Sequence, residues 1–217
     1  LWGKYRPCRR NLCRRGIKMY LERLNTIREM RKSSCIAVVV SGMVLTGVHH
    51  AVDAYDIIFP MNFGARGSAT LGGMLSTNAG GSNVLRYGNT RDLCHGIEVV
   101  LPNSEITNLM SEFHKDNPGC NLRHLMIGAE DTLGIITAAV LKLVPKPKAY
   151  TSAMLATRSL DDALLLFNRL QILTDGAVQA FEYMPKKYLE KYFQIFPNAH
   201  QPFSHIRQHN IIVELAT

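Results

Sequence analysis

Glycine is concentrated in one central segment of the chain, and this segment constrains the fold more than any other feature. GARGSATLGGMLSTNAGG runs from Gly64 to Gly81, and residues 64–88 hold 7 of the 16 glycines. Each glycine raises the entropy cost of ordering the backbone. The segment therefore predicts either a glycine-rich turn inside a β-rich core or a backbone surface that lies directly against a ligand.

Two common nucleotide-binding loops do not fit this segment. A Walker loop ends in Gly-Lys-Ser/Thr, and no lysine follows a glycine between residues 64 and 88. A Rossmann turn needs G-x-G-x-x-G before a helix, whereas the glycines here have other spacings and no helical period follows them. Two alternatives therefore stay open on equal terms: a long extended loop, whose small polar side chains suit a large flat cofactor that carries a pyrophosphate, and a glycine-rich turn inside a β-rich core.

Positive charge is confined to the first residues of the chain. The 217 residues have a formal net charge of +8, but residues 1–32 contain 11 Lys or Arg and only two Glu, leaving 14 basic and 15 acidic side chains elsewhere. A nucleic-acid-binding protein presents its basic residues on a folded face, so no nucleic-acid partner is expected. The alternative, a basic-tailed nucleic-acid binder, predicts salt-sensitive binding that is lost when residues 1–20 are deleted.

Residues 1–20 are expected to be a basic leader, either disordered or a non-native start, and they partly resemble an import signal. The five cysteines are odd in number and lack C-x-x-C spacing, which indicates reduced thiols. No apolar run approaches the ~20 residues that span a membrane. We expect no metal site, and a location in the mitochondrial matrix or the cytoplasm.

Hydrophobic periodicity predicts an α+β fold for the first part of the chain. A buried strand is expected over residues 36–42 and a helix from Leu45 to Tyr55, in which His49 and His50 are ordinary helix residues. Residues 96–109 predict a hairpin, and residues 134–144 a long strand.

A second pattern begins after Pro145 and Pro147, which mark the expected domain boundary. Strands are predicted over residues 151–157, 177–184 and 210–216. Between the first two of them, an amphipathic helix is expected to follow Ser159 as its N-cap. This β-α-β order predicts a separate small α/β domain.

Two sequence blocks resemble a known family. GARGSATLGGMLSTNAGGSNVLRYGNTRD and IGAEDTLGIITAAVLKLVPKP stand in order on either side of the expected hairpin. They resemble the FAD-linked oxidoreductases of the vanillyl-alcohol-oxidase (PCMH-type FAD-binding) superfamily, in the branch of D-lactate dehydrogenase, D-2-hydroxyglutarate dehydrogenase and the FAD subunit of glycolate oxidase. The alkylglycerone-phosphate synthase branch differs where TNAGG stands here. The resemblance covers about residues 20–217.

The resemblance implies the second half of a PCMH-type FAD-binding domain over residues 21–147 and the start of a ferredoxin-like substrate cap domain over residues 148–217. FAD is the implied cofactor. The residues implied along the flavin and its diphosphate are Pro60, Gly64, Ala65, Gly67 and Ser68. Those implied around the isoalloxazine and ribityl chain are Gly72, Gly73, Thr77, Asn78, Gly80 and Gly81. Those implied at the adenosine end, mainly through backbone atoms, are Glu130, Gly134, Ile135, Ile136 and Thr137.

The implied reaction oxidises a D-2-hydroxyacid of the D-lactate, D-2-hydroxyglutarate or glycolate type to the 2-oxoacid by hydride transfer to flavin. The hydroxyacid and an electron acceptor are the implied partners. Relatives carry a glycine-rich pyrophosphate loop ahead of the segment matching YLERLNTI, and catalytic histidines beyond the position of Thr217, so the chain is expected to be truncated at both ends. No catalytic residue is assigned, although His95 and His124 are the nearest candidates by position.

The alternative is a non-catalytic remnant of the fold that has lost flavin. Met74 stands where the family usually has Asn, and Asp131 where it usually has Gly. A positive φ at Asp131 would strain its backbone, although Asp tolerates such a conformation better than most residues.

Overall fold

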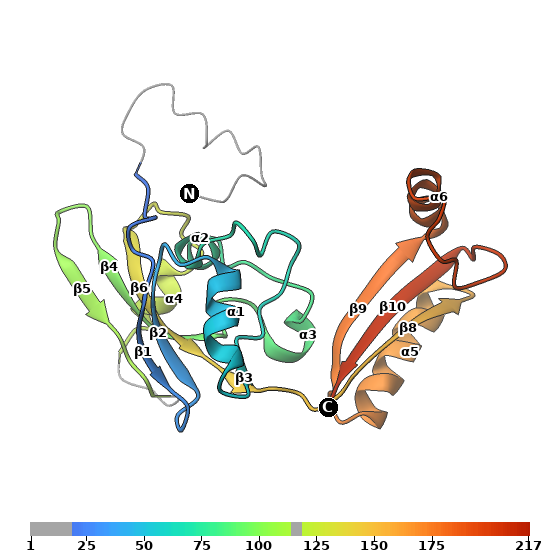
Figure 1. The fold of residues 1–217 in the computed structure, drawn as a ribbon, viewed down its shortest axis with the longest axis horizontal. Coiled ribbons are helices and arrows are strands. Elements are labelled where there is room, and N and C mark those ends of the chain that lie inside the picture. Colours follow the sequence, from blue (N-terminus) through green and yellow to red (C-terminus); the bar gives the residue numbers. More distant parts are fainter. Residues whose placement is uncertain (1–18, 114–118) are drawn as a thin grey trace. The chain divides into compact units, whose positions relative to one another are not determined.

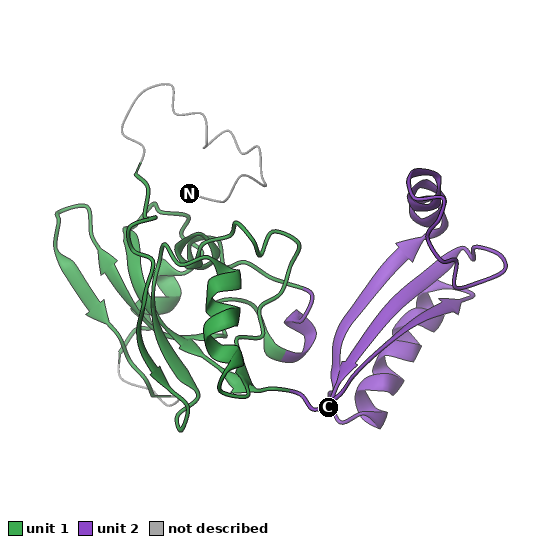
Figure 2. Ribbon diagram, viewed as in Figure 1, with its two compact units in different colours: residues 1–81, 87–146 green, residues 82–86, 147–217 purple. Residues whose placement is uncertain are grey.

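The structure, a computed structural model, describes residues 19–113 and 119–217 and divides into two compact units (Figures 1 and 2). Unit 1 comprises residues 1–81 and 87–146, and unit 2 comprises residues 82–86 and 147–217. The division at residues 146 and 147 falls at the two prolines that the sequence pattern marks. Most of the expected leader, residues 1–18, lies outside the described residues.

Unit 1 is built on a five-stranded sheet in the order β1-β2-β6-β4-β5, in which every neighbouring pair is antiparallel. The strands are β1 (Ile27–Arg31), β2 (Ile36–Val40), β4 (Cys94–Val100), β5 (Ile106–Leu109) and β6 (Ile135–Lys142). The predicted hairpin is confirmed by the pairing of β4 with β5. All five residues of β2 are buried, which explains why its sequence is an unbroken apolar run.

Three helices and a short two-stranded ladder belong to unit 1 with this sheet. They are α1 (Leu45–Asp53), α2 (Leu71–Ser76), α4 (Leu122–Met126), and the paired strands β3 (Ile57–Ile58) and β7 (Val144–Pro145). The short helix α3 (Val84–Tyr87) falls mostly within residues 82–86, which belong to unit 2. The predicted helix is confirmed as α1, which buries Leu45, Val48 and Val52 at helical spacing. These side chains share one hydrophobic core with buried residues of the sheet, such as Val39 of β2, Ile97 of β4 and Ala139 of β6.

The expectation of an extended loop throughout the glycine-rich segment is wrong over residues 71–76, because these residues form α2. Thr70 caps the helix, with its Oγ1 accepting a hydrogen bond from the Gly73 amide. Every residue of α2 is buried, so the helix has no polar face and its sequence shows no amphipathic period. Burial rather than propensity stabilises this helix, since Gly72 and Gly73 are both poor helix formers.

Unit 2 contains a three-stranded antiparallel sheet in the order β8-β10-β9 (Figure 1). Its elements are β8 (Tyr150–Thr157), α5 (Leu160–Leu173), β9 (Val178–Pro185), α6 (Lys186–Ile195) and β10 (His209–Ala216). Ser159 is confirmed as the N-cap of α5, its Oγ accepting from the Asp162 amide at 3.0 Å. Helix α5 packs Ala163 against Ile211 and Val213 of the central strand.

Candidate functional site

The loop of residues 64–68, here called the open loop, exposes its backbone. Apart from chain neighbours, no heavy atom of the described residues lies within 4 Å of the position that a Cβ would take at Gly64 or Gly67. Among the hydrogen bonds of residues 19–113 and 119–217, none is donated by the backbone amides of Gly64, Ala65 or Gly67. The open loop thus presents three free N–H donors, a surface suited to phosphate oxygens.

Helix α1 holds the open loop in place. The Leu45 amide donates to the Ala69 carbonyl at 2.9 Å, and the Thr46 amide donates to the Arg66 carbonyl at 3.2 Å. Inside the loop, the Ser68 amide donates to the Ala65 carbonyl at 2.9 Å. The carbonyls of Ala65 and Arg66 and the amides of Arg66 and Ser68 are therefore bound within the protein, whereas the amides of Gly64, Ala65 and Gly67 donate no hydrogen bond within the described residues.

His49 fixes the segment that leads into the open loop. Its ring Nε2 lies 2.9 Å from the Met61 carbonyl oxygen, as expected for an Nε2–H donor. Burial lowers the pKa of His49 below its ordinary value, and the hydrogen bond to Met61 opposes this shift. Met61 and its neighbour Pro60 are both buried, so Pro60 lies beneath the surface at the start of this segment.

The amides at the start of α2 differ from those of the open loop, because they already have partners. The Leu71 amide donates to the Met43 carbonyl at 2.9 Å, and the Gly72 amide donates to the Ser41 carbonyl at 2.8 Å. A Cβ on Gly72 would lie 2.9 Å from the Ser41 Cβ. Close packing of α2 on the end of β2 thus explains this glycine.

The Ser41 hydroxyl is the one unusual polar group at this contact. Ser41 is fully buried, and its Oγ has no hydrogen-bond partner within the described part of the chain. A buried hydroxyl without a partner costs free energy. No pattern in the sequence singles out Ser41, so sequence reasoning missed it.

The residues that follow α2 form a turn that is largely bound within unit 1. The Thr77 Oγ1 donates to the Gly73 carbonyl at 2.9 Å. Asn78 has a φ of +47°, and its Oδ1 accepts from the Arg91 amide at 2.9 Å. A Cβ on Gly81 would lie 2.3 Å from the Asn62 carbonyl oxygen, whereas Gly80 is exposed. Gly81 is thus explained by the crossing of two backbone segments.

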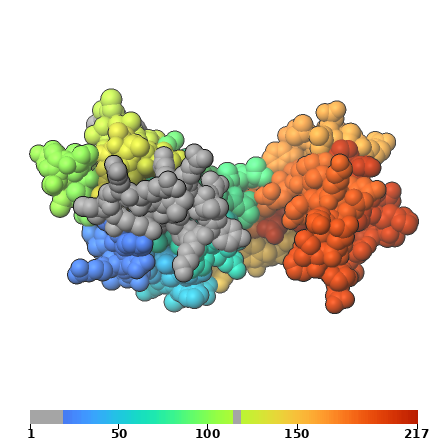
Figure 3. All heavy atoms as spheres, turned by 90° about the horizontal axis from the view of Figure 1, so that it is seen from above, coloured from blue at the N-terminus to red at the C-terminus, as the bar shows by residue number. Residues whose placement is uncertain are grey.

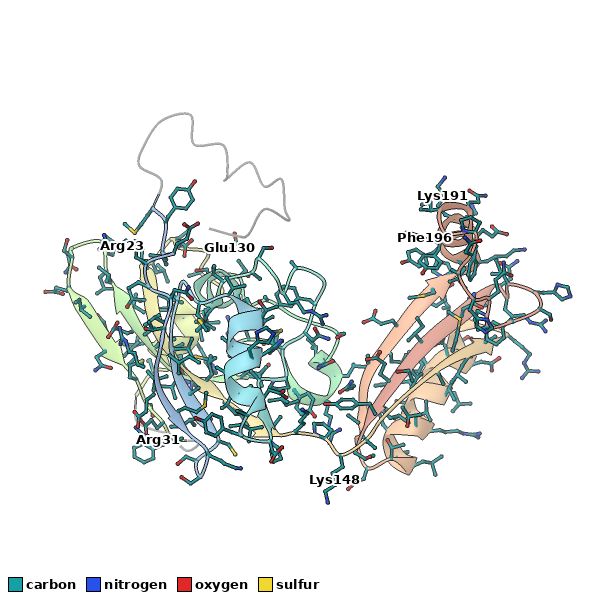
Figure 4. All side chains as sticks on the ribbon, viewed as in Figure 1. Arg23, Arg31, Glu130, Lys148, Lys191 and Phe196 are labelled. Carbon is teal, nitrogen blue, oxygen red and sulfur yellow. The ribbon has the colours of Figure 1, made fainter. Side chains whose placement is uncertain are left out.

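A strained turn over residues 127–131 is attached to the end of α2. Gly128, Glu130 and Asp131 have φ values of +89°, +53° and +65°, which confirms the positive φ considered for Asp131. The Gly128 amide donates to the Leu75 carbonyl at 3.0 Å, and the Glu130 amide donates to the Ser76 carbonyl at 2.7 Å. Figure 4 shows Glu130 at the end of unit 1 that carries α2, opposite Arg31. Such clustered strain is common at ligand sites.

Side chains reinforce this turn. The Ser76 Oγ donates to a carboxylate oxygen of Asp131 at 2.5 Å. The Arg91 guanidinium donates to the Ile127 carbonyl at 2.5 Å. Sequence reasoning missed Arg91, which links the Asn78 turn to the 127–131 turn, and its place in the NTRD segment gave no signal of this role.

The predicted adenosine-end residues lie at the start of β6, within the sheet. Ile135 and Ile136 pair with Val100 and Val99 of β4. A Cβ on Gly134 would lie 2.7 Å from the Val99 Cγ1, so this glycine too is explained by packing. The backbone of these residues is therefore mostly packed against β4.

The Thr137 side chain is held by a carboxylate. Its Oγ1 donates to the Glu98 Oε1 at 2.7 Å, and Arg28 donates two hydrogen bonds to the same carboxylate at 3.0 and 2.9 Å. The Arg28 guanidinium lowers the pKa of Glu98, burial opposes the shift, and the hydroxyl adds to it. This network stabilises the sheet on the face away from α1 and α2.

Two histidines near the site have no assigned chemistry. His95 is buried in β4, and its carbonyl, like that of Cys94, accepts a hydrogen bond from Arg123. His124 lies in α4, where burial and the neighbouring Arg123 and Arg91 lower its pKa. Over the ranges that the structure describes, no three His, Cys, Asp or Glu residues gather closely enough to hold a metal ion.

The predicted residues thus divide into two groups. The open loop and Gly80 expose their backbone, whereas Gly72, Gly81 and Gly134 pack against other backbone segments. All of the predicted residues lie in unit 1. Within this set, the amides of Gly64, Ala65 and Gly67 in the open loop, and those of Gly80 and Gly81, donate no hydrogen bond within the described residues.

Sequence comparison relates the chain to flavin-domain proteins. Residues 7–110 match the family described as FAD binding domain. The chain is 36% identical over 196 residues to D-2-hydroxyglutarate dehydrogenase of Xanthomonas citri pv. viticola, covering 90% of this chain and 41% of that protein. It is 37% identical over 161 residues to mitochondrial D-2-hydroxyglutarate dehydrogenase of Danio rerio, covering 74% and 30%. It is 34% identical over 187 residues to D-lactate dehydrogenase of Anaerostipes hadrus, covering 84% and 39%.

Structural comparison gives the same fold. Alkyldihydroxyacetonephosphate synthase superposes with a TM-score of 0.69 at 19% identity, over 90% of this chain and 37% of that one. The expected PCMH-type α+β fold is thereby confirmed, while the relatives by sequence are dehydrogenases. The chain spans about two fifths of the length of the first relatives it matches. Residues 7–110 thus match the FAD binding domain family, and the chain is similar in sequence to D-2-hydroxyglutarate and D-lactate dehydrogenases.

Proposed function

We propose that this chain binds FAD and contributes to the oxidation of a D-2-hydroxyacid, of the D-2-hydroxyglutarate, D-lactate or glycolate type, to the 2-oxoacid. The main support is its 36% identity to a D-2-hydroxyglutarate dehydrogenase over 90% of the chain. The activity is assigned to a protein of that relative's length. In it, this chain supplies the second half of the flavin domain and the start of the substrate cap.

The open loop fits the diphosphate of FAD. Its three free amides supply directed donors, and the exposed Arg66 adds a positive charge beside them. The Arg66 guanidinium also donates to the Asn62 Oδ1 at 3.1 Å, which restricts its position. When bound, FAD supplies a ring system that accepts a hydride from the hydroxyacid. The role of the chain's own residues is to bind and orient this group.

Unit 2 is proposed as the beginning of the cap that binds the hydroxyacid. Its three-stranded sheet with α5 and α6 agrees with the β-α-β order expected of such a domain. A small hydroxyacid and an electron acceptor are the proposed partners. The mitochondrial matrix or the cytoplasm is the proposed location, and the Danio rerio relative, which is named as mitochondrial, supports the first.

A second candidate function is a non-catalytic remnant of the same fold without flavin. One observation favours it: the amides of Leu71 and Gly72, which start α2 in the glycine-rich segment, are bound to protein carbonyls. Among the described residues of that segment up to Gly73, the amides of Gly64, Ala65, Gly67 and Thr70 then remain without an acceptor. A chain with so small a phosphate contact binds FAD weakly or not at all.

The two candidates are separated by titrating FAD with the purified chain and recording the quenching of flavin fluorescence. Gly67→Asp is the informative variant, because the space beside Gly67 is open and the new carboxylate repels a diphosphate. We expect the Kd for FAD to rise by about tenfold or more, since two negative charges a few Å apart near a protein surface repel each other by a few kcal/mol.

Asn103→Asp is the matched control, since it adds the same charge to the exposed β4–β5 turn of the same unit. It is expected to leave both the Kd and the thermal stability unchanged. A folded chain that does not quench flavin fluorescence would favour the remnant. Equal loss of binding in both variants would exclude the open loop as the diphosphate site.

A further inference from the structure

Helix α6 carries a line of exposed apolar side chains. Tyr188, Tyr192, Ile195 and Phe196 are exposed by 53%, 40%, 58% and 53%. Their spacing places them on one side of the helix and its end. We call these four residues the α6 stripe.

The α6 stripe is not the side of the helix that packs on the sheet. Leu189, which is only 4% exposed, and the half-buried Phe193 attach α6 to unit 2. The Tyr192 ring contacts the rings of Phe193 and Phe196, with centroids 5.4 and 5.0 Å apart. The aromatic cluster is therefore pre-formed, and the fold leaves its outer side in water.

An open apolar groove of about 430 Å³ is lined by α6 and by residues of the sheet. Tyr188 and Tyr192 of the stripe line it together with Met154, Met184 and Ile212. The apolar surface thus continues from the stripe along this open groove. Such continuity favours a partner that is itself apolar over some depth.

Positive charge accompanies the stripe. Residues 186–209 contain Lys186, Lys187, Lys191 and Arg207 but only one acidic residue, Glu190. Glu190 lies 3.7 Å from Lys186, and neither Lys187 nor Lys191 has a carboxylate partner among the ion pairs of the described residues.

The pictures place these groups together. Figure 4 shows Lys191 and Phe196 at one end of unit 2 and Lys148 at the other. In Figure 3 the orange-red residues of α6 lie on the surface that faces the viewer. The aromatic and basic groups of α6 are thus accessible at the same end of the unit.

We propose that α6 binds the surface of a bilayer that contains anionic phospholipid. The stripe lies among the headgroups, where tyrosine is favoured, and Lys187 and Lys191 pair with lipid phosphates. This is binding to a surface rather than insertion across it, since no helix of the described residues is long and apolar enough to span a membrane. The proposal goes beyond the proposed function by assigning a place to the protein.

Charge and composition favour a bilayer over other partners. A second copy of the chain would bring lysines against lysines, which opposes association through this face. A nucleic acid would pair with the lysines and stack on tyrosine, but it would gain nothing from Ile195. An anionic bilayer complements all parts of the surface.

The test is co-sedimentation of the full chain with vesicles of phosphatidylcholine, with or without phosphatidylserine. We expect binding only to vesicles with phosphatidylserine, weakening as salt is raised. Lys187→Gln with Lys191→Gln removes both charges and should lower the vesicle partition coefficient by about fivefold for each lysine. Tyr192→Ser with Phe196→Ser should also lower it, whereas Lys148→Gln, the matched control, should not.

Several results would overturn the proposal. One is equal binding to neutral and anionic vesicles, and another is a loss with Lys148→Gln as large as with the α6 variants. A third is no vesicle binding while α6 binds a single-stranded RNA oligonucleotide or a second copy. Lys187→Arg with Lys191→Arg keeps both charges and should restore binding, which separates loss of charge from loss of folding.

Discussion

The open loop and the start of α2 are neighbours in sequence and both contain glycine, yet their backbones have opposite roles. At Gly64 and Gly67 no atom of the described residues occupies the space for a side chain, and the amides donate no hydrogen bond within them. At Gly72 the space is occupied by Ser41 and the amide is bound to a carbonyl. The comparison teaches that a glycine-rich segment combines two needs, an exposed surface for a ligand and close contact between backbone segments.

The largest expected effect separates these two kinds of glycine by stability. Gly81→Ala should lower the free energy of unfolding by roughly 2–3 kcal/mol, because its Cβ would meet backbone atoms of Asn62 that cannot move aside. Gly64→Ala should change it by less than about 0.5 kcal/mol, because nothing occupies that space. Urea denaturation followed by circular dichroism measures both. Equal losses in the two variants would refute the division into open and packed glycines.

A smaller effect is expected at Ser41. Ser41→Ala removes a buried hydroxyl that has no partner within the described residues, so the chain should gain up to about 1 kcal/mol of stability or remain unchanged. Titrating the same variant with FAD tests whether the Ser41 hydroxyl contributes to cofactor binding. A loss of affinity would show that the hydroxyl serves the cofactor, and would extend the ligand surface to the end of β2.

The smallest expected effect is a dependence of the free energy of unfolding on pH, which arises from His49 next to the segment that leads into the open loop. Burial lowers the pKa of His49 in the folded state, so the unfolded chain binds the proton more readily. The contribution of neutral His49 to the free energy of unfolding is therefore fully present above the ordinary histidine pKa of about 6.5. It is lost as the pH falls through the lower pKa that His49 has in the folded chain.

Replacing His49 tests this dependence. Gln can still donate to Met61 but does not titrate, so His49→Gln should reduce the slope of unfolding free energy against pH in this range. His124, whose pKa burial also lowers, accounts for part of the remaining slope. A slope unchanged by the substitution would exclude His49 as its source.

The sequence predicted those parts of the fold whose side chains follow a period. The β4–β5 hairpin, α1 and the Ser159 cap are confirmed because local patterns determine them. Helix α2 was missed because it is buried on all sides. Strand β1 was not predicted, because IREMR is an edge strand with charged residues, and its apolar residues follow neither a helical period nor strand alternation.

The site was predicted less completely than the fold, for a physical reason. The family resemblance gave a set of glycines, but whether a glycine faces a ligand depends on what lies opposite it in space. Gly81 meets Asn62 and Gly72 meets Ser41, neighbours that are 19 and 31 positions away in the printed sequence. No local pattern encodes such contacts, so the structure is needed to sort the glycines.

We expect the free amides in the open loop, not the amides at the start of α2, to receive the cofactor phosphates. The most direct measurement follows backbone amide resonances of the ¹⁵N-labelled chain while FAD is added. The resonances of Gly64, Ala65 and Gly67 should shift most and saturate as the FAD concentration rises. Shifts centred on Leu71 and Gly72, with the open loop unaffected, would contradict it.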